Sequence, residues 1–169
     1  MTPTIYLAHG ASGSAASMRP HVTGLERRGL HAVAVQLQRG GPAARAVPRY
    51  REAAPDSSAV IGGHSFGGRV ASLLAAEEPY AGLVLLSFPL HRPGHPETAE
   101  ARTEHFGAIS CPVLLLSGES DPFARLEALR EAVKRLPNGE LVTYPNVGHG
   151  LTPVLDDALD RIAAFVRGL

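Results

Sequence analysis

Short apolar runs alternate with longer amphipathic stretches along the chain, and each apolar run is rich in Val, Ile, Leu or Ala. Strands that are buried on both faces carry such continuous runs, and consecutive parallel strands need a long crossover between them. The pattern therefore predicts an α/β protein with one parallel sheet that is covered by helices on both faces. The expected strands are residues 4–9, 31–36, 59–62, 82–87, 112–117 and 140–144.

The segments between these strands carry apolar residues at steps of three and four, which is the spacing of one helix face. Helices are expected near residues 18–25, 67–78, 126–136 and 155–169. Residues 88–104 are rich in Pro and His, and we expect them to be irregular. Six strands and their helices use almost all of the 169 residues, so we expect a single domain over residues 1–169 with no cap.

Composition and charge exclude several classes of partner. The chain has 16 basic and 16 acidic side chains, and this neutral balance disfavours binding to nucleic acid or to an anionic membrane. There is no run of membrane-spanning length and no basic leader segment, and the single cysteine, Cys111, can form no internal disulfide. We expect a cytoplasmic protein without a membrane or nucleic-acid partner, and we make no prediction of its oligomeric state.

A glycine-bracketed serine follows the third expected strand. Gly63-His64-Ser65-Phe66-Gly67 leads at once into a helix, which is the G-x-S-x-G pattern in its strand-turn-helix context. A side chain at Gly63 or Gly67 is expected to collide with neighbouring backbone, because the turn at the serine is sharp. A phosphate-binding loop is the alternative, but it needs Lys at Gly68 and Ser or Thr at Arg69. The pattern predicts Ser65 as a nucleophile.

A nucleophilic serine needs a base, and the base needs an acid that orients it. His149, between two glycines after the sixth expected strand, is the candidate base. Two carboxylates, Glu119 and Asp121, follow the fifth strand, and Asp121 is preferred because Asp-Pro opens the next helix and can fix the carboxylate. All of these positions follow carboxyl ends of parallel strands, where ligands bind in open α/β sheets.

Two backbone N–H groups are expected to bind the negative oxygen of a tetrahedral intermediate. The N–H of Phe66, which follows the nucleophile, is the first. The second is expected from the glycine-rich turn after the first strand, where Ala11 is preferred and Ser12 is the alternative.

These motifs resemble the α/β-hydrolase superfamily over nearly the whole chain: HGASG, GHSFG, GESDPF and GHG follow the first, third, fifth and sixth expected strands. GGHSFGGRVASLLAAE and SFPLHRPGHPETAEARTEHF look most like small bacterial hydrolases near the dienelactone hydrolases, a group related to a subunit of the non-specific-lethal chromatin complex. The resemblance implies Ser65 as nucleophile, Asp121 as acid and His149 as base, and it implies hydrolysis without a cofactor. Ser65 stands where the dienelactone hydrolases proper use Cys, and the first two strands of the superfamily core are missing.

We therefore expect a minimal α/β-hydrolase fold with six parallel strands in the order 2-1-3-4-5-6. The expected activity is that of a serine esterase, which cleaves small carboxylic esters or thioesters through an acyl-enzyme. Alternatives are an acyltransferase or perhydrolase that uses the same three residues, and a non-catalytic binding or scaffold module. Zero net charge and the absence of Trp favour small, uncharged or weakly charged acyl substrates over polymers.

Two further groups of residues are candidates for binding an acyl group or a metal. An acyl pocket is predicted from apolar residues beside the catalytic loops, namely Met18, Phe88, Leu90, Phe123 and Leu151. His91, His95 and His105 suggest a metal site, but prolines and a glycine break the helix that would align them, and no Asp or Cys completes the set. We predict no metal.

Overall fold

The computed structural model describes residues 1–169 and contains one six-stranded parallel sheet with the strand order β2-β1-β3-β4-β5-β6. This order and direction confirm the prediction, and each strand lies within two residues of its expected bounds. The strands are β1 (Ile5–Ala8), β2 (Ala32–Val35), β3 (Val60–His64), β4 (Gly82–Leu86), β5 (Val113–Gly118) and β6 (Gly139–Tyr144).

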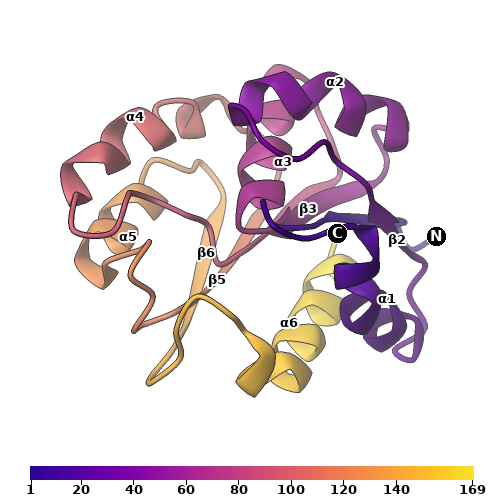
Figure 1. The fold of residues 1–169 in the computed structure, drawn as a ribbon. Helices are drawn as coiled ribbons and strands as arrows, with labels where there is room; N and C mark the ends of the chain where they lie inside the picture. Colours follow the sequence, from indigo (N-terminus) through magenta and orange to yellow (C-terminus); the bar gives the residue numbers. More distant parts are fainter.

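Helices cover both faces of the sheet (Figure 1). One face carries α1 (Arg19–Glu26) and α6 (Leu155–Arg167), whose apolar residues share one hydrophobic cluster with the strands. The other face carries α2 (Ala43–Ala53), α3 (Phe66–Glu77), α4 (Ala99–Thr103) and α5 (Leu126–Val133), which pack into a second cluster. The central strands β4 and β5 are buried along their whole length, as expected for a sheet covered on both sides. There is no cap over the carboxyl edge of the sheet.

Two segments differ from expectation. Helix α2 was not predicted, and it contains Pro48, which lacks the N–H that continues a helix ladder. Its buried residues nevertheless recur with helical spacing, at Ala43, Ala46, Val47 and Tyr50. Residues 88–104 are also less irregular than predicted, since they hold the short 3-10 turn Pro96–Thr98 and helix α4.

The hydroxyl of Tyr50 fastens α2 to the strand that carries the serine turn. It lies 2.6 Å from the carbonyl oxygen of Gly62 and accepts a hydrogen bond of 2.9 Å from the N–H of the same residue. Tyr50 is fully buried, and burial raises the pKa of its phenol, so the hydroxyl stays protonated and able to donate. None of the helices combines the length and the apolar character that crossing a membrane requires.

Candidate active site

The turn between β3 and α3 holds Ser65 in a strained backbone conformation, with φ 51° and ψ −119°. A positive φ costs a residue with a Cβ about 1 to 3 kcal/mol, and it persists only where the surroundings enforce it. Here the surroundings are backbone. A Cβ at Gly63 would lie 2.6 Å from the carbonyl oxygen of Ala8, and one at Gly67 would lie 2.5 Å from the same oxygen. The steric reason predicted for both glycines is confirmed.

The loops after β5 and β6 are bound to each other through their backbones. The N–H of Ser120 donates to the carbonyl of Val147 at 2.9 Å, and the N–H of Glu119 donates to the carbonyl of Tyr144 at 2.9 Å. Gly118 makes this approach possible, because a Cβ there would lie 2.1 Å from the carbonyl oxygen of Val147. The two loops therefore fix the relative positions of the residues that follow, Asp121 and His149.

Asp121, His149 and Ser65 form a chain of hydrogen bonds. Nδ1 of His149 lies 2.8 Å from Oδ2 of Asp121, and Nε2 of His149 lies 2.9 Å from Oγ of Ser65. A carboxylate can only accept, so Nδ1 carries the proton and Nε2 is free to accept the proton of the serine hydroxyl. The second oxygen of Asp121 accepts the N–H of Phe123 at 2.8 Å, and the carboxylate is completely buried.

Glu119, the other carboxylate considered for the acid, is used elsewhere. Its Oε1 accepts a hydrogen bond of 2.9 Å from the hydroxyl of Thr143 on β6. Of the two carboxylates, only that of Asp121 contacts the imidazole of His149.

Two side chains hold the His149 loop in place. The ring of Phe123 packs against the imidazole of His149 with ring centroids 4.6 Å apart. His64, next to Ser65, lies with its Nε2 3.2 Å from the carbonyl oxygen of His149, to which it donates. Burial lowers the pKa of His64, which keeps its ring neutral. The side chain of His149 is still 27% exposed, so solvent reaches this site.

The predicted N–H donors Phe66 and Ala11 lie on the same cavity as Ser65 and His149, as does the alternative, Ser12. Phe66 is the first residue of α3, where an N–H has no partner inside the helix. The N–H of Ala11 makes no hydrogen bond within the protein. A Cβ at the adjacent Gly10 would lie 3.7 Å from Cβ of Ser65, which shows how closely this loop approaches the serine. Both amides are therefore available to a ligand at Ser65.

Comparison with known sequences decides the family. Residues 42–163 match the model of the family described as "Alpha/beta hydrolase domain", which is more than two thirds of the chain. The chain belongs to the alpha/beta hydrolase family.

The proteins similar to this chain have several activities. A segment of 68 residues is 38% identical to the non-heme chloroperoxidase of Burkholderia pyrrocinia, and it spans 39% of this chain but only 24% of that enzyme. The monoacylglycerol lipase of Paleococcus ferrophilus superposes with a TM-score of 0.84 at 15% identity, over 98% of this chain and 95% of that one. Est1E from Butyrivibrio proteoclasticus, solved with ferulic acid bound, superposes with a TM-score of 0.82 at 18% identity, over 98% and 88% of the two chains. At these identities the two structures establish the shared fold alone.

The residues around Ser65 line a cavity of about 550 Å³. The acyl-pocket prediction is largely wrong, because of its five residues only Phe123 lines this cavity. Phe88 and Leu90 lie in the cluster beneath α2, α3 and α5, and Met18 and Leu151 lie in the cluster beneath α1 and α6. Each of these four is at most 3% exposed, because burying such side chains in the core is more favourable than leaving them on a solvated wall.

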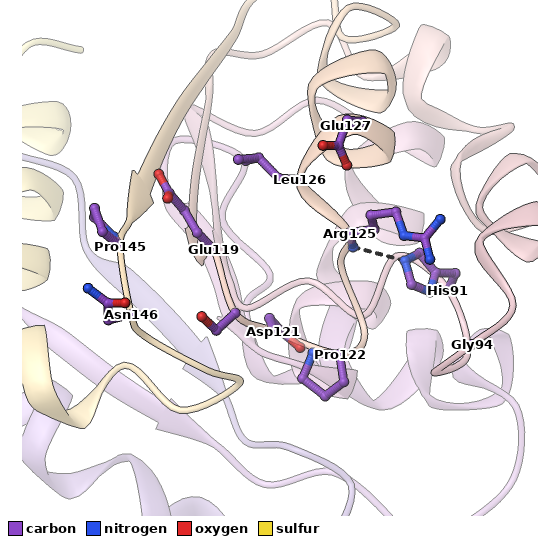
Figure 2. Close-up of a pocket in the computed structure, with 11 residues that line it drawn as sticks. His91, Gly94, Glu119, Asp121, Pro122, Arg125, Leu126, Glu127, Pro145 and Asn146 are labelled. Atoms are coloured by element: carbon purple, nitrogen blue, oxygen red, sulfur yellow. Dashed lines mark hydrogen bonds between the residues drawn. The ribbon is translucent and has the colours of Figure 1, made fainter.

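A second cavity, of about 620 Å³, lies behind the loop of Asp121, and most of its lining residues are polar or charged (Figure 2). His91 lies on its wall with both ring nitrogens occupied by backbone. Nε2 accepts the N–H of Arg125 at 2.9 Å, as the dashed line in Figure 2 marks, and Nδ1 donates to the carbonyl of Arg92 at 2.8 Å. This histidine therefore supports the loop that carries Asp121.

The three histidines considered for a metal have separate partners. His91 bonds to backbone, His95 to Glu97 at 3.0 Å, and His105 to the hydroxyl of Ser72 at 2.8 Å. No group of three or more His, Cys, Asp or Glu residues could hold a metal ion.

Sequence reasoning missed Arg69, whose side chain lies on the same cavity as Ser65. The sequence argument used Arg69 only to exclude a phosphate-binding loop, which needs Ser or Thr at this position. Its position was the available signal, because Arg69 lies in the first turn of the helix that begins directly after Ser65.

Proposed function

We propose that the chain is a serine hydrolase that cleaves small carboxylic esters or thioesters. The observation that carries this proposal is the pair of hydrogen bonds at His149, 2.8 Å to Asp121 and 2.9 Å to Ser65, at a serine held in a strained turn. Backbone strain of this kind clusters at functional sites, because at other positions it lowers the stability of the fold and serves no function. The family membership supports the same reaction class.

In the proposed mechanism, Oγ of Ser65 attacks the substrate carbonyl while Nε2 of His149 takes the hydroxyl proton. Asp121 holds the imidazole in the correct tautomer and stabilises the imidazolium that forms. The N–H groups of Phe66 and Ala11 bind the oxyanion of the tetrahedral intermediate. His149 then gives its proton to the departing alcohol or thiol, which leaves an acyl group on Ser65. Water, deprotonated by His149, attacks this acyl group, and the acid and the free serine are released.

No other side chain competes with Ser65 as nucleophile. Burial raises the pKa of the single thiol, Cys111, to about 11, so it stays protonated near neutral pH.

We infer that the chain stands near the dienelactone-hydrolase-like group but uses serine chemistry. A cytoplasmic location and small-molecule acyl substrates, with neither nucleic acid nor membrane as partner, belong to the same proposal.

Perhydrolysis is a second candidate, and the similarity to a non-heme chloroperoxidase favours it. In this reaction hydrogen peroxide replaces water in the second step. The peroxide oxygen attacks the acyl group on Ser65, the ester bond to Oγ breaks, and a peracid leaves while His149 returns a proton to the serine. Product analysis with acyl substrate and peroxide distinguishes the two reactions.

The test is labelling of the protein by a fluorophosphonate probe, together with turnover of a panel of p-nitrophenyl esters. Wild type is expected to label and to hydrolyse short esters, and Ser65→Ala to lose labelling and about 10⁴-fold or more in kcat. Ser57→Ala is the matched control, because Ser57 is exposed in the turn before β3 and makes no side-chain contact. Absence of labelling and of turnover in wild type would support the non-catalytic scaffold instead. Labelling that survives Ser65→Ala would show that the nucleophile is another residue.

A further inference from the structure

The cavity at Ser65 contains one permanent charge, the guanidinium of Arg69. The other lining residues are glycines, serines, apolar side chains and the two histidines His64 and His149. Arg69 lies in the first turn of α3, and its N–H donates to the carbonyl of Ser65 at 3.1 Å, so nucleophile and cation stand one helical turn apart.

Arg69 has no partner of its own within the protein. Its side chain makes no hydrogen bond, and no carboxylate oxygen lies within 4 Å. Some other arginines do have such a partner: Arg28, Arg51 and Arg161 each bind at least one acidic side chain. Arg69 is nevertheless half-buried, and burial lowers the pKa of its guanidinium. A desolvated charge without a counterion is unfavourable, and an anion in the cavity would relieve it.

The neighbours of Arg69 add to the positive potential rather than cancel it. Arg102 donates from Nη1 to the carbonyl of Pro89 at 2.8 Å, and Pro89 itself lines the cavity. Repulsion from Arg102 further lowers the pKa of Arg69. The pKa of Arg102 is itself lowered by burial and by repulsion from Arg92. The chain is neutral as a whole, but this wall of the site is cationic.

Two residues fix the backbone that presents Arg69. The hydroxyl of Ser72 donates to the carbonyl of Arg69 at 2.8 Å, and Nε2 of His105 lies 2.8 Å from the oxygen of that hydroxyl. Burial and the nearby Arg69 lower the pKa of His105 to about 4, so the ring is neutral and donates through Nε2–H without adding charge.

We propose that Arg69 binds a carboxylate on the acyl part of the substrate, so that the enzyme hydrolyses half-esters or half-thioesters of small dicarboxylic acids. This inference rests on the proposed serine-hydrolase function and narrows its substrate class. It commits to a charged acyl group, whereas the net charge of the chain favoured uncharged or weakly charged substrates. One singly charged planar carboxylate matches one guanidinium, which can bind it through two parallel hydrogen bonds. Because Ser65 and Arg69 line the same cavity of about 550 Å³, the carboxylate and the reacting carbonyl must belong to one small acyl group.

The experiment compares two ethyl esters of equal chain length, monoethyl glutarate and ethyl valerate, by ethanol release at fixed ionic strength. The quantity measured is the ratio of their kcat/KM values, charged over neutral. This ratio is expected to fall about 10- to 100-fold from wild type to Arg69→Gln, the usual effect of losing a hydrogen-bonded charge. Arg69→Lys is expected to restore part of it. Arg27→Gln, which removes an exposed unpaired arginine at the end of α1, should keep the wild-type ratio.

A second measurement needs no turnover and no variant that could misfold. Glutarate is expected to slow fluorophosphonate labelling of wild-type Ser65 at concentrations where valeramide, which has the same chain length but no carboxylate, does not. The carboxylate proposal is overturned if wild type hydrolyses ethyl valerate but Arg69→Gln leaves the ratio unchanged, or if glutarate protects no better than valeramide. Failure of wild type to label and to hydrolyse either ester is a different result, because it overturns the serine-hydrolase function itself.

Discussion

Replacing Asp121 by asparagine exchanges one carboxylate oxygen for an NH₂ group and leaves the shape of the side chain unchanged. Oδ1 of Asp121 accepts the N–H of Phe123 at 2.8 Å, and Oδ2 accepts Nδ1–H of His149 at 2.8 Å. If the amide oxygen keeps the bond to Phe123, the NH₂ group faces Nδ1. Two donors cannot bond to each other, so the imidazole must move its proton to Nε2, where it blocks the acceptance of the serine proton.

The opposite orientation of the amide does not rescue the site. The amide oxygen would then face His149 correctly, but the NH₂ would oppose the N–H of Phe123 in a fully buried position. Leaving buried donors unpaired costs about 1 to 3 kcal/mol each. We expect Asp121→Asn to reduce kcat about 10³- to 10⁴-fold, which corresponds to about 4 to 5.5 kcal/mol at 1.36 kcal/mol per tenfold change.

The assay is hydrolysis of p-nitrophenyl butyrate together with the second-order rate of fluorophosphonate labelling. Glu119→Gln is the matched control, because it also replaces a carboxylate in the same loop, one that bonds to Thr143 instead of His149. Its kcat should stay within about threefold of wild type, because exposed or remote polar contacts contribute little. The reasoning is refuted if a folded Asp121→Asn variant retains more than a tenth of the wild-type kcat, or if Glu119→Gln loses as much activity.

Two further predictions concern stability. Gly67→Ala places a Cβ 2.5 Å from the carbonyl oxygen of Ala8, and since this neighbour is backbone that cannot move aside, we expect a loss of at least about 2 kcal/mol in urea unfolding. Gly107→Ala, with nothing within 4 Å of the new Cβ, should stay within about 0.5 kcal/mol of wild type, and an equal loss in both variants would contradict the steric argument. Burial lowers the pKa of both His21 and His105 to about 4. Repulsion from a protonated His64 further lowers the pKa of His21, and repulsion from Arg69 further lowers that of His105. The unfolded chain therefore binds more protons than the native one between about pH 6.5 and pH 4, and the unfolding free energy should fall with decreasing pH there, by up to about 1.4 kcal/mol per pH unit for each group. His105→Gln should flatten this slope, and an unchanged slope in that variant would count against a neutral buried His105.

The strands and the serine turn were predictable because their signals are local. A strand buried on both faces must be apolar throughout, and the glycines at 63 and 67 are required by contacts with one strand neighbour. The residues Asp121 and His149 could be proposed because each follows a strand that ends at the same edge of the sheet. That the two loops are bound by backbone hydrogen bonds, with Gly118 allowing the contact, was not visible in the sequence.

The errors came from reading single residues without their surroundings. The helical spacing of residues 43–50 was not recognised, and the helix there includes Pro48, because a helix in a folded protein tolerates one lost hydrogen bond when its apolar face is buried. Large apolar residues near the catalytic loops were assigned to a pocket, but in a chain of this length the two core clusters take them up, Phe88 and Met18 among them. Arg69 was missed because its effect depends on the absence of a partner, and an absence can be recognised only when the neighbours are known.

Reactivity and substrate choice depend on different parts of this site. The positions of Ser65, Asp121 and His149 depend on close backbone contacts at Gly63, Gly67 and Gly118, and every such contact leaves no room even for a methyl group. The wall of the cavity at Ser65 includes the side chains of Arg69 and Phe123, which would contact a bound substrate. These two side chains take no part in the backbone contacts that hold the serine turn. It follows that substitutions at Arg69 can change which acyl group is accepted while the hydrogen bonds of the serine, histidine and aspartate persist. A change at the glycines should instead remove the reaction for every substrate.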